Sequence, residues 1–124
     1  MIHLDTRFLI RALCPGSPQA RQLLIWLDGP GAVSLSAVAW AEFLCGPVSA
    51  DVTAIARTLL GEPVPLGTAG AERAAQLFNE TGRRRGSLLD CLIAATAIEA
   101  GAQLATENPR DFERFTAAGL DLVA

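Results

Sequence analysis

The sequence contains no lysine, and all ten of its cationic side chains are arginines. This absence excludes P-loop phosphate binding and Schiff-base catalysis, because both need a lysine amine. The single histidine, His3, lies in an apolar segment typical of a strand, so we interpret it as a packing or edge residue. Catalysis by a Ser-His-Asp or Cys-His arrangement is therefore not indicated.

Cysteines and long apolar runs are also scarce. Cys14, Cys45 and Cys91 are an odd number without CxxC spacing, and in apolar helical surroundings we expect them to behave as small hydrophobes, with neither a disulfide framework nor a zinc site indicated. No apolar run reaches the roughly 18 residues of a membrane span, and no secretory leader is present, so we expect a cytoplasmic protein without membrane contact. With 124 residues, 51% of them hydrophobic, the chain predicts a single domain over residues 1–124.

Acidic or amide side chains occur in apolar surroundings in several distant segments. They are Asp5, Glu42, Asp90 and the Asn108/Asp111 pair. A carboxylate buried without a partner takes up a proton, so several such acids together indicate an external cation. Oxygen ligands are those that Mg²⁺ and Mn²⁺ prefer. The pattern predicts a metal site assembled from distant segments.

Three of these acids also have an ordinary interpretation. Asp5 can cap the helix that follows it. Asp90 can be a first-turn acid that reciprocates a Ser87 cap, and Glu42 can face solvent if its helix is rotated. All three ordinary interpretations would have to hold at once, at positions that also follow the strand and helix order of a single fold. This coincidence is less expected than a shared metal site.

Turn signals divide the chain into short elements without a linker between domains. We expect strands over residues 2–4, 32–35, 64–66, 103–105 and 120–123. Helices fill the intervals, and those near residues 36–45 and 87–98 carry Glu42 and Asp90. This order predicts an α/β fold with a mostly parallel sheet covered on both faces, and it brings the acids to one edge of that sheet.

Four segments carry a resemblance to a known family. They are Ile2-His3-Leu4-Asp5-Thr6, Ala41-Glu42-Phe43, Asp90-Cys91-Leu92-Ile93-Ala94-Ala95-Thr96-Ala97 and Leu104-Ala105-Thr106-Glu107-Asn108-Pro109-Arg110-Asp111-Phe112. Over essentially the whole chain they resemble the PIN-domain ribonucleases, and among these the VapC-type toxins of toxin–antitoxin systems. The resemblance implies a three-layer α/β/α fold with about five strands. It also implies a Mg²⁺- or Mn²⁺-dependent endoribonuclease, a homodimer, that cleaves RNA and is inhibited by a VapB-like antitoxin.

The family's metal-binding acids correspond to Asp5, Glu42 and Asp90. Asp5 and Asp90 are expected to coordinate the metal directly, and Glu42 to bind it or to position the attacking water. Thr6 and Thr106 are expected to orient these ligands through hydroxyl hydrogen bonds.

Two positions depart from the family's pattern. Asn108 stands where the family often has a fourth aspartate, so Asp111 is expected to take part directly or through water, and Asn108 or Asp111 is expected to hold a second, weaker metal. Arg7 replaces a frequent asparagine and suits contact with RNA or with a carboxylate. The missing aspartate leaves open a catalytically degenerate PIN-fold module that acts through protein partners. A phosphoacceptor signalling domain is disfavoured by the absence of lysine.

The charge of the chain is −3, which argues against an extended surface for nonspecific binding of nucleic acid. One dense basic run is present, Arg83-Arg84-Arg85, which is a candidate contact for RNA phosphates. With Arg7 and Arg11 it is also a candidate contact for an acidic antitoxin segment, and a solvated loop is the alternative. The high apolar content and residues 22–27, which include Leu24 and Trp26, favour a dimer surface, with a generous core as the alternative.

Overall fold

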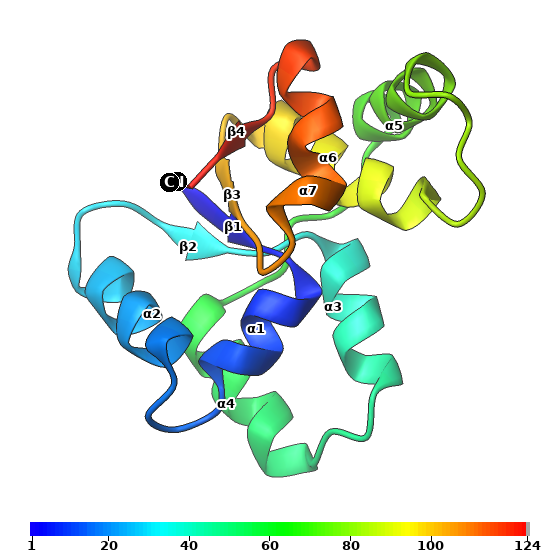
Figure 1. The fold of residues 1–124 in the computed structure, drawn as a ribbon. Coiled ribbons are helices and arrows are strands. Elements are labelled where there is room, and N and C mark those ends of the chain that lie inside the picture. The colour runs from blue at the N-terminus through cyan, green and yellow to red at the C-terminus, as the bar shows by residue number, and fades with distance from the viewer. Residues whose placement is uncertain (124) are drawn as a thin grey trace.

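Strands and helices alternate along the chain in the computed structural model, which describes residues 1–123 (Figure 1). The strands are β1 (Ile2–Leu4), β2 (Val33–Ser34), β3 (Gln103–Ala105) and β4 (Asp121–Leu122). The helices are α1 (Thr6–Ala12), α2 (Pro18–Asp28), α3 (Ala37–Cys45), α4 (Ala50–Leu60), α5 (Thr68–Glu80), α6 (Leu88–Ala100), α7 (Pro109–Phe112) and the 3₁₀ helix η1 (Glu113–Ala118). The predicted α/β class and the predicted order of helices are confirmed.

The sheet is parallel and has the order β2-β1-β3-β4. In its centre, β1 pairs with β2 on one side and with β3 on the other. The backbone N–H of Asp5 donates to the carbonyl of Ala105 at 3.0 Å, so the chain leaves β1 beside the end of β3. Parallel strands place their carboxyl ends at the same edge, where α/β proteins bind ligands.

The strand expected at residues 64–66 does not form. Val64 makes only an isolated parallel bridge with Ser36, in which the Val64 N–H donates to the carbonyl of Leu35 at 2.9 Å. Pro63 and Pro65 flank it, and neither has an N–H with which to extend a ladder. The sheet consequently has four strands where about five were expected.

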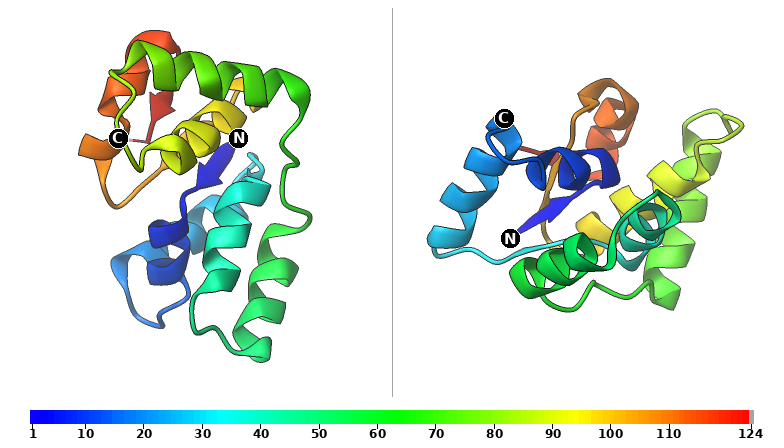
Figure 2. Two further views of the ribbon diagram at one scale, coloured as in Figure 1. Left: turned by 90° about the vertical axis from the view of Figure 1, so that its right-hand side faces the viewer. Right: turned by 90° about the horizontal axis from the view of Figure 1, so that it is seen from below.

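The helices that carry the acidic residues pack closely against the sheet and one another. α5 lies along α6, and α1 lies between α2 and α3 (Figure 2). α6 is buried on most of its surface because small residues such as Ala94, Ala95 and Ala97 let it approach its neighbours. His3 is buried in β1, as a packing residue would be.

The helical surroundings expected of the cysteines are found at two of three positions. Cys91 is buried in α6 and Cys45 is the exposed last residue of α3, whereas Cys14 is exposed in the turn that follows α1. All three are free thiols. Among residues 1–123, none of the helices is long and apolar enough to cross a membrane.

Candidate functional site

A cleft of about 360 Å³ lies at the carboxyl edge of the strands. All five acidic and amide side chains predicted for the site line it: Asp5, Glu42, Asp90, Asn108 and Asp111. The remaining lining residues include Thr6, Arg7 and the apolar side chains of Ile10, Ile93 and Phe112. The fold therefore brings together residues that are spread over most of the chain.

Asp5 serves as a helix cap and as part of the cleft at once. Its side chain is 5% exposed, and its Oδ1 accepts a hydrogen bond from the Phe8 N–H at 2.8 Å, which caps α1. The alternatives raised by the sequence, a cap or a site residue, are thus compatible. The cap holds the carboxylate in place at the end of β1.

Glu42 faces the cleft rather than solvent. α3 begins after Ser36, whose Oγ accepts from the Ala39 N–H at 3.0 Å, and it lies beside α1. The Thr6 hydroxyl donates to Oε1 of Glu42 at 2.8 Å. This contact between α1 and α3 fixes the orientation of the carboxylate, which is the geometry expected of a supporting threonine.

Asp90 lies in the first turn of α6 but is not part of a capping box. The Ser87 hydroxyl donates to the carbonyl of Arg84 at 2.7 Å and makes no cap to the helix. The Asp90 side chain is 35% exposed, and it borders the cleft. Its position next to the helix N-terminus favours a negative charge there.

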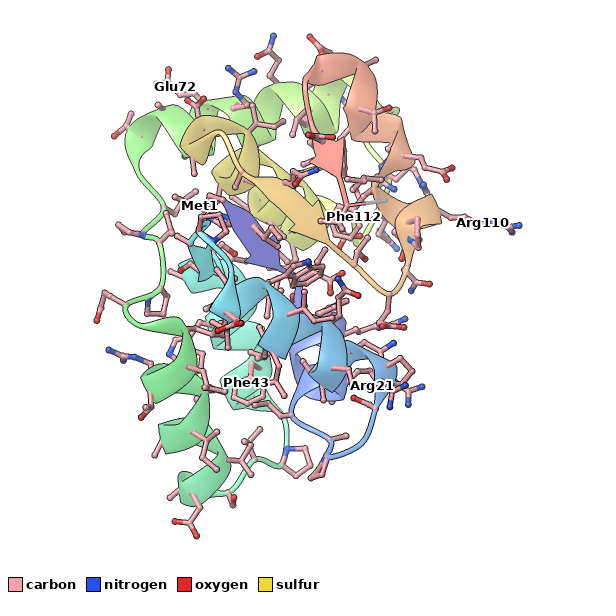
Figure 3. The ribbon with its side chains drawn as sticks, turned by 90° about the vertical axis from the view of Figure 1, so that its left-hand side faces the viewer. Met1, Arg21, Phe43, Glu72, Arg110 and Phe112 are labelled. Atoms are coloured by element: carbon pink, nitrogen blue, oxygen red, sulfur yellow. The ribbon has the colours of Figure 1, made fainter. Side chains whose placement is uncertain are left out.

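The loop after β3 supplies the amide corner of the cleft. The Thr106 hydroxyl accepts from the Asn108 N–H at 3.0 Å, and its position beside Asp5 lowers the pKa of that carboxyl. α7 starts directly after Asn108, and the Asp111 N–H donates to the Asn108 carbonyl at 3.0 Å. Within α7, Phe112 is buried while Arg110 projects away from the molecule (Figure 3).

The two most central acids are held in conditions that favour their neutral forms. Burial raises the pKa of Asp5, and the charges of Asp90 and Glu107 add to this, although hydrogen bonds from Thr106 and Phe8 oppose it. Burial also raises the pKa of Asp90, helped by the charge of Asp111. Carboxyl groups in this state gain most from a cation that neutralises them.

We expect the unfolding free energy of the chelator-treated protein to depend on these two acids. A raised pKa means that the folded state holds more protons, so the stabilising contribution is complete below about pH 4, the ordinary pKa, and is lost as pH rises through the raised value. Asp5→Asn retains a good cap and removes this titration. Its melting temperature relative to the parent should therefore increase with pH above 4.

The difference in melting temperature between the parent and Asp5→Asn is the quantity to compare, because His3 changes the stability of both proteins with pH in the opposite direction. Burial lowers the pKa of His3, so its contribution is lost as pH falls. Thermal melts of both proteins from pH 4 to 8 in chelator test this prediction. A constant difference across that range would contradict it.

Sequence reasoning missed Arg114, a cation behind the cleft. Its Nη2 lies 3.9 Å from Oδ2 of Asp90, its Nη1 donates to the Asp111 carbonyl, and its guanidinium lies 4.4 Å from the Phe115 ring centroid. Its charge opposes the upward shift in the pKa of Asp90. Spacing along the chain relates Arg114 to Asp111, but only the packing of α7, which leads into η1, against α6 relates it to Asp90.

The predicted basic residues fall into two groups. Arg7 lines the cleft, and Arg11 borders an adjoining cavity. The run from Arg83 to Arg85 is exposed in the loop between α5 and α6 and lines neither cavity. The charges of Arg114 and Arg7 both lower the pKa of Asp90.

The residues of the cleft fit a hard divalent cation by the chemistry of their donors. Four carboxylates and one amide offer oxygen, and no sulfur or imidazole ligand is present among them. Among residues 1–123, no three acidic, histidine or cysteine side chains already meet around one point. Like-charged carboxylates separate from one another, and here Asp5 and Glu42 are held by Phe8 and Thr6 instead.

A family model for the PIN domain matches residues 2–118. The chain belongs to the PIN-domain family. The resemblance carried by the four motifs is thereby confirmed, and the fold of this PIN domain is the α/β fold that the resemblance implied. No curated protein has a sequence significantly similar to it.

Solved structures of toxin–antitoxin systems share this fold. The VapBC2 complex from Rickettsia felis, bound to a promoter DNA fragment, matches with a TM-score of 0.78 at 22% identity, over 99% of this chain and 98% of that one. A toxin–antitoxin complex from Klebsiella pneumoniae matches with a TM-score of 0.70 at 27% identity, over 90% of each chain. VapC20 from Mycobacterium tuberculosis, a toxin that cleaves the sarcin–ricin loop, matches with a TM-score of 0.68 at 19% identity, over 99% and 98%.

Proposed function

We propose that this PIN domain is a Mg²⁺- or Mn²⁺-dependent endoribonuclease toxin inhibited by a cognate VapB-like antitoxin. The observation that carries the proposal is the convergence of Asp5, Glu42, Asp90 and Asp111, with Asn108, on one cleft. Liquid water takes about 30 Å³ per molecule, so a cleft of about 360 Å³ has room for an ion with several waters. Such a site suits phosphodiester hydrolysis.

Each side chain of the cleft has a role that follows from its environment. Asp5 and Asp90, whose pKa values are raised, would hold the divalent ion, and the ion would supply positive charge for the scissile phosphate and lower the pKa of a water molecule. Glu42, oriented by Thr6, holds the attacking water and accepts its proton. Asn108 and Asp111, which line the same cleft, would offer further oxygen donors.

The named structures support both partners in this proposal. The Mycobacterium tuberculosis toxin of the same fold cleaves the sarcin–ricin loop, which supports RNA as the substrate. The complexes from Rickettsia felis and Klebsiella pneumoniae contain a toxin with its antitoxin, which supports an antitoxin partner. We propose Arg83, Arg84 and Arg85 as contacts for an acidic antitoxin segment, because they are exposed outside the cleft.

A homodimer is part of the same proposal. Leu24 and Ile25 of α2 are 63% and 65% exposed, which leaves apolar surface for a second copy. Trp26, which the sequence suggested for the same surface, stacks on Phe8 at 5.4 Å between ring centroids and belongs to the core of this protomer. The oligomeric state in solution, measured by light scattering for the parent and Leu24→Ser, tests the surface.

Cleavage of total bacterial RNA by the purified protein tests the proposal directly. We expect discrete fragments with Mg²⁺ or Mn²⁺, and none with chelator or with Asp5→Ala, which excludes a contaminating nuclease. Mapping the fragment ends then gives the cleaved sequence. Fragments that persist in both controls would contradict the proposal.

The second candidate is a PIN-fold module that acts through protein partners without cleaving. Asn108 favours it, because an amide in place of a fourth carboxylate weakens the attraction for a cation at that corner. The four carboxylates that remain in the cleft favour the nuclease. Folded, antitoxin-free protein that binds its antitoxin and cleaves no RNA would support the module instead.

A further inference from the structure

A second cavity continues the acidic cleft along helix α1. It is about 210 Å³ in volume and is lined by Arg7, Ile10, Arg11 and Glu107. Arg7 and Ile10 also line the acidic cleft, so the two cavities share a wall. A strand of RNA whose scissile phosphate lies among the carboxylates therefore has a path out of the cleft along α1.

The face of α1 that lines this path combines charge and apolar surface. Positions 7, 10 and 11 lie on one face of a helix, and Arg7 and Arg11 are separated by about 6 Å along its axis. Ile10 is 47% exposed between them. Successive phosphates of one strand lie about 3.4 Å apart along a duplex axis and farther apart in an extended strand, so two guanidinium groups at this spacing can contact two phosphates.

The opposite wall restricts where phosphates can lie. Glu107 is held in place by Gln19, whose side-chain N–H donates to its carboxylate across from α1. A carboxylate repels phosphate oxygens, so the backbone of the strand must follow the arginine side of the cavity. The bases or sugars then face Glu107 and Ile10.

We infer that Arg7 and Arg11 form the phosphate-binding track for RNA entering or leaving the acidic cleft. This inference rests on the proposed function and assigns the track to α1 rather than to the Arg83–Arg85 run. The run is denser in charge, but it borders neither cavity. Arg7 also lowers the pKa of Asp90, so its replacement would change the acidic cleft as well as the track. Arg11 is therefore the residue to test.

Binding of a fluorescent, mixed-sequence single-stranded RNA tests the track without any cleavage. In an Asp90→Asn background, Arg11→Ala should weaken binding several-fold and make the slope of log K against log salt less negative by about 0.7, the value for one lost contact with a single strand. Arg11→Lys should recover most of the affinity because it keeps the charge. Arg84→Ala, the matched control, should change neither the affinity nor the slope.

The outcomes separate this inference from the proposed function. Unchanged affinity and slope in Arg11→Ala, or a larger effect of Arg84→Ala, would overturn the track even if the parent protein cleaves RNA. Loss of antitoxin affinity in Arg11→Ala with unchanged RNA binding would assign this face of α1 to the antitoxin and would also overturn it. An Arg11-dependent salt slope in a protein that cuts no RNA would uphold the track and count against the nuclease.

Discussion

Asp90→Asn should lower the rate of RNA cleavage by about 10²- to 10³-fold, the usual loss when one group that stabilises developing charge is removed. Asparagine matches aspartate in size but has one oxygen and no charge to offer a cation. Asp90 borders the cleft from the first turn of α6, and no backbone group in that turn can replace its carboxylate. The measurement is the initial rate on a substrate that contains the mapped cleavage site, at saturating Mn²⁺.

The matched control for this variant is Asp51→Asn. Asp51 is also a first-turn acid, in α4, but it is exposed and lies outside the cleft. It should retain the parent rate because Asp51 lies outside the cleft, although the substitution removes the same charge from the first turn of a helix. Equal rates for the parent and Asp90→Asn would rule out the assignment of Asp90 as a metal ligand.

Millimolar Mg²⁺ or Mn²⁺ should raise the melting temperature of the protein relative to chelator. Binding at a free concentration one hundred times Kd stabilises the folded state by about 2.7 kcal/mol. For a domain near this size that corresponds to about 8–16 °C. The physical reason is that Asp5 and Asp90 have raised pKa values, which means that their charged forms are unfavourable in the folded protein. A bound cation offsets the cost of desolvating these charges and reduces the repulsion between them.

In the same experiment, Asp90→Asn should lose the response to metal. In chelator the variant should melt above the parent, because it lacks a charge that the folded state disfavours, and added metal should change its melting temperature little. Differential scanning calorimetry of both proteins, with and without metal, gives the four melting temperatures. If metal leaves the parent unchanged, and the variant melts like it, the cleft is not a metal site.

Local sequence carried most of the information about secondary structure. The apolar segment before Asp5 and the small-residue helix after Ser87 were predictable because periodicity and capping act between neighbouring residues. The strand at 64–66 was wrong because the apolar character of Val64 and Leu66 was weighted above the missing N–H groups of Pro63 and Pro65. The prolines were visible in the sequence, so this error was avoidable without the structure.

The convergence of the acids was also predictable, although less directly. The prediction depended on parallel strands, whose carboxyl ends share an edge, and on acids that follow those strands or lie in apolar helices. The five side chains do line one cleft, but their hydrogen bonds were not derivable from the sequence. Whether Asp5 capped α1 or joined the site could not be decided, and the structure shows that one oxygen caps while the residue also lines the cleft.

The amino-acid sequence by itself determined the class of the fold, the residues that form the acidic cleft and, through four ordered motifs, the family. Only the tertiary structure decided which cations accompany those acids. Arg114 reaches Asp90 because α7, which leads into η1, packs against α6, whereas the Arg83–Arg85 run borders neither cavity despite being near Asp90 in sequence. The reason is physical. A functional carboxylate can be recognised in an apolar stretch of sequence because burying its charge costs free energy. An exposed arginine has no such cost at most surface positions, so its partners depend on the path of the chain in space.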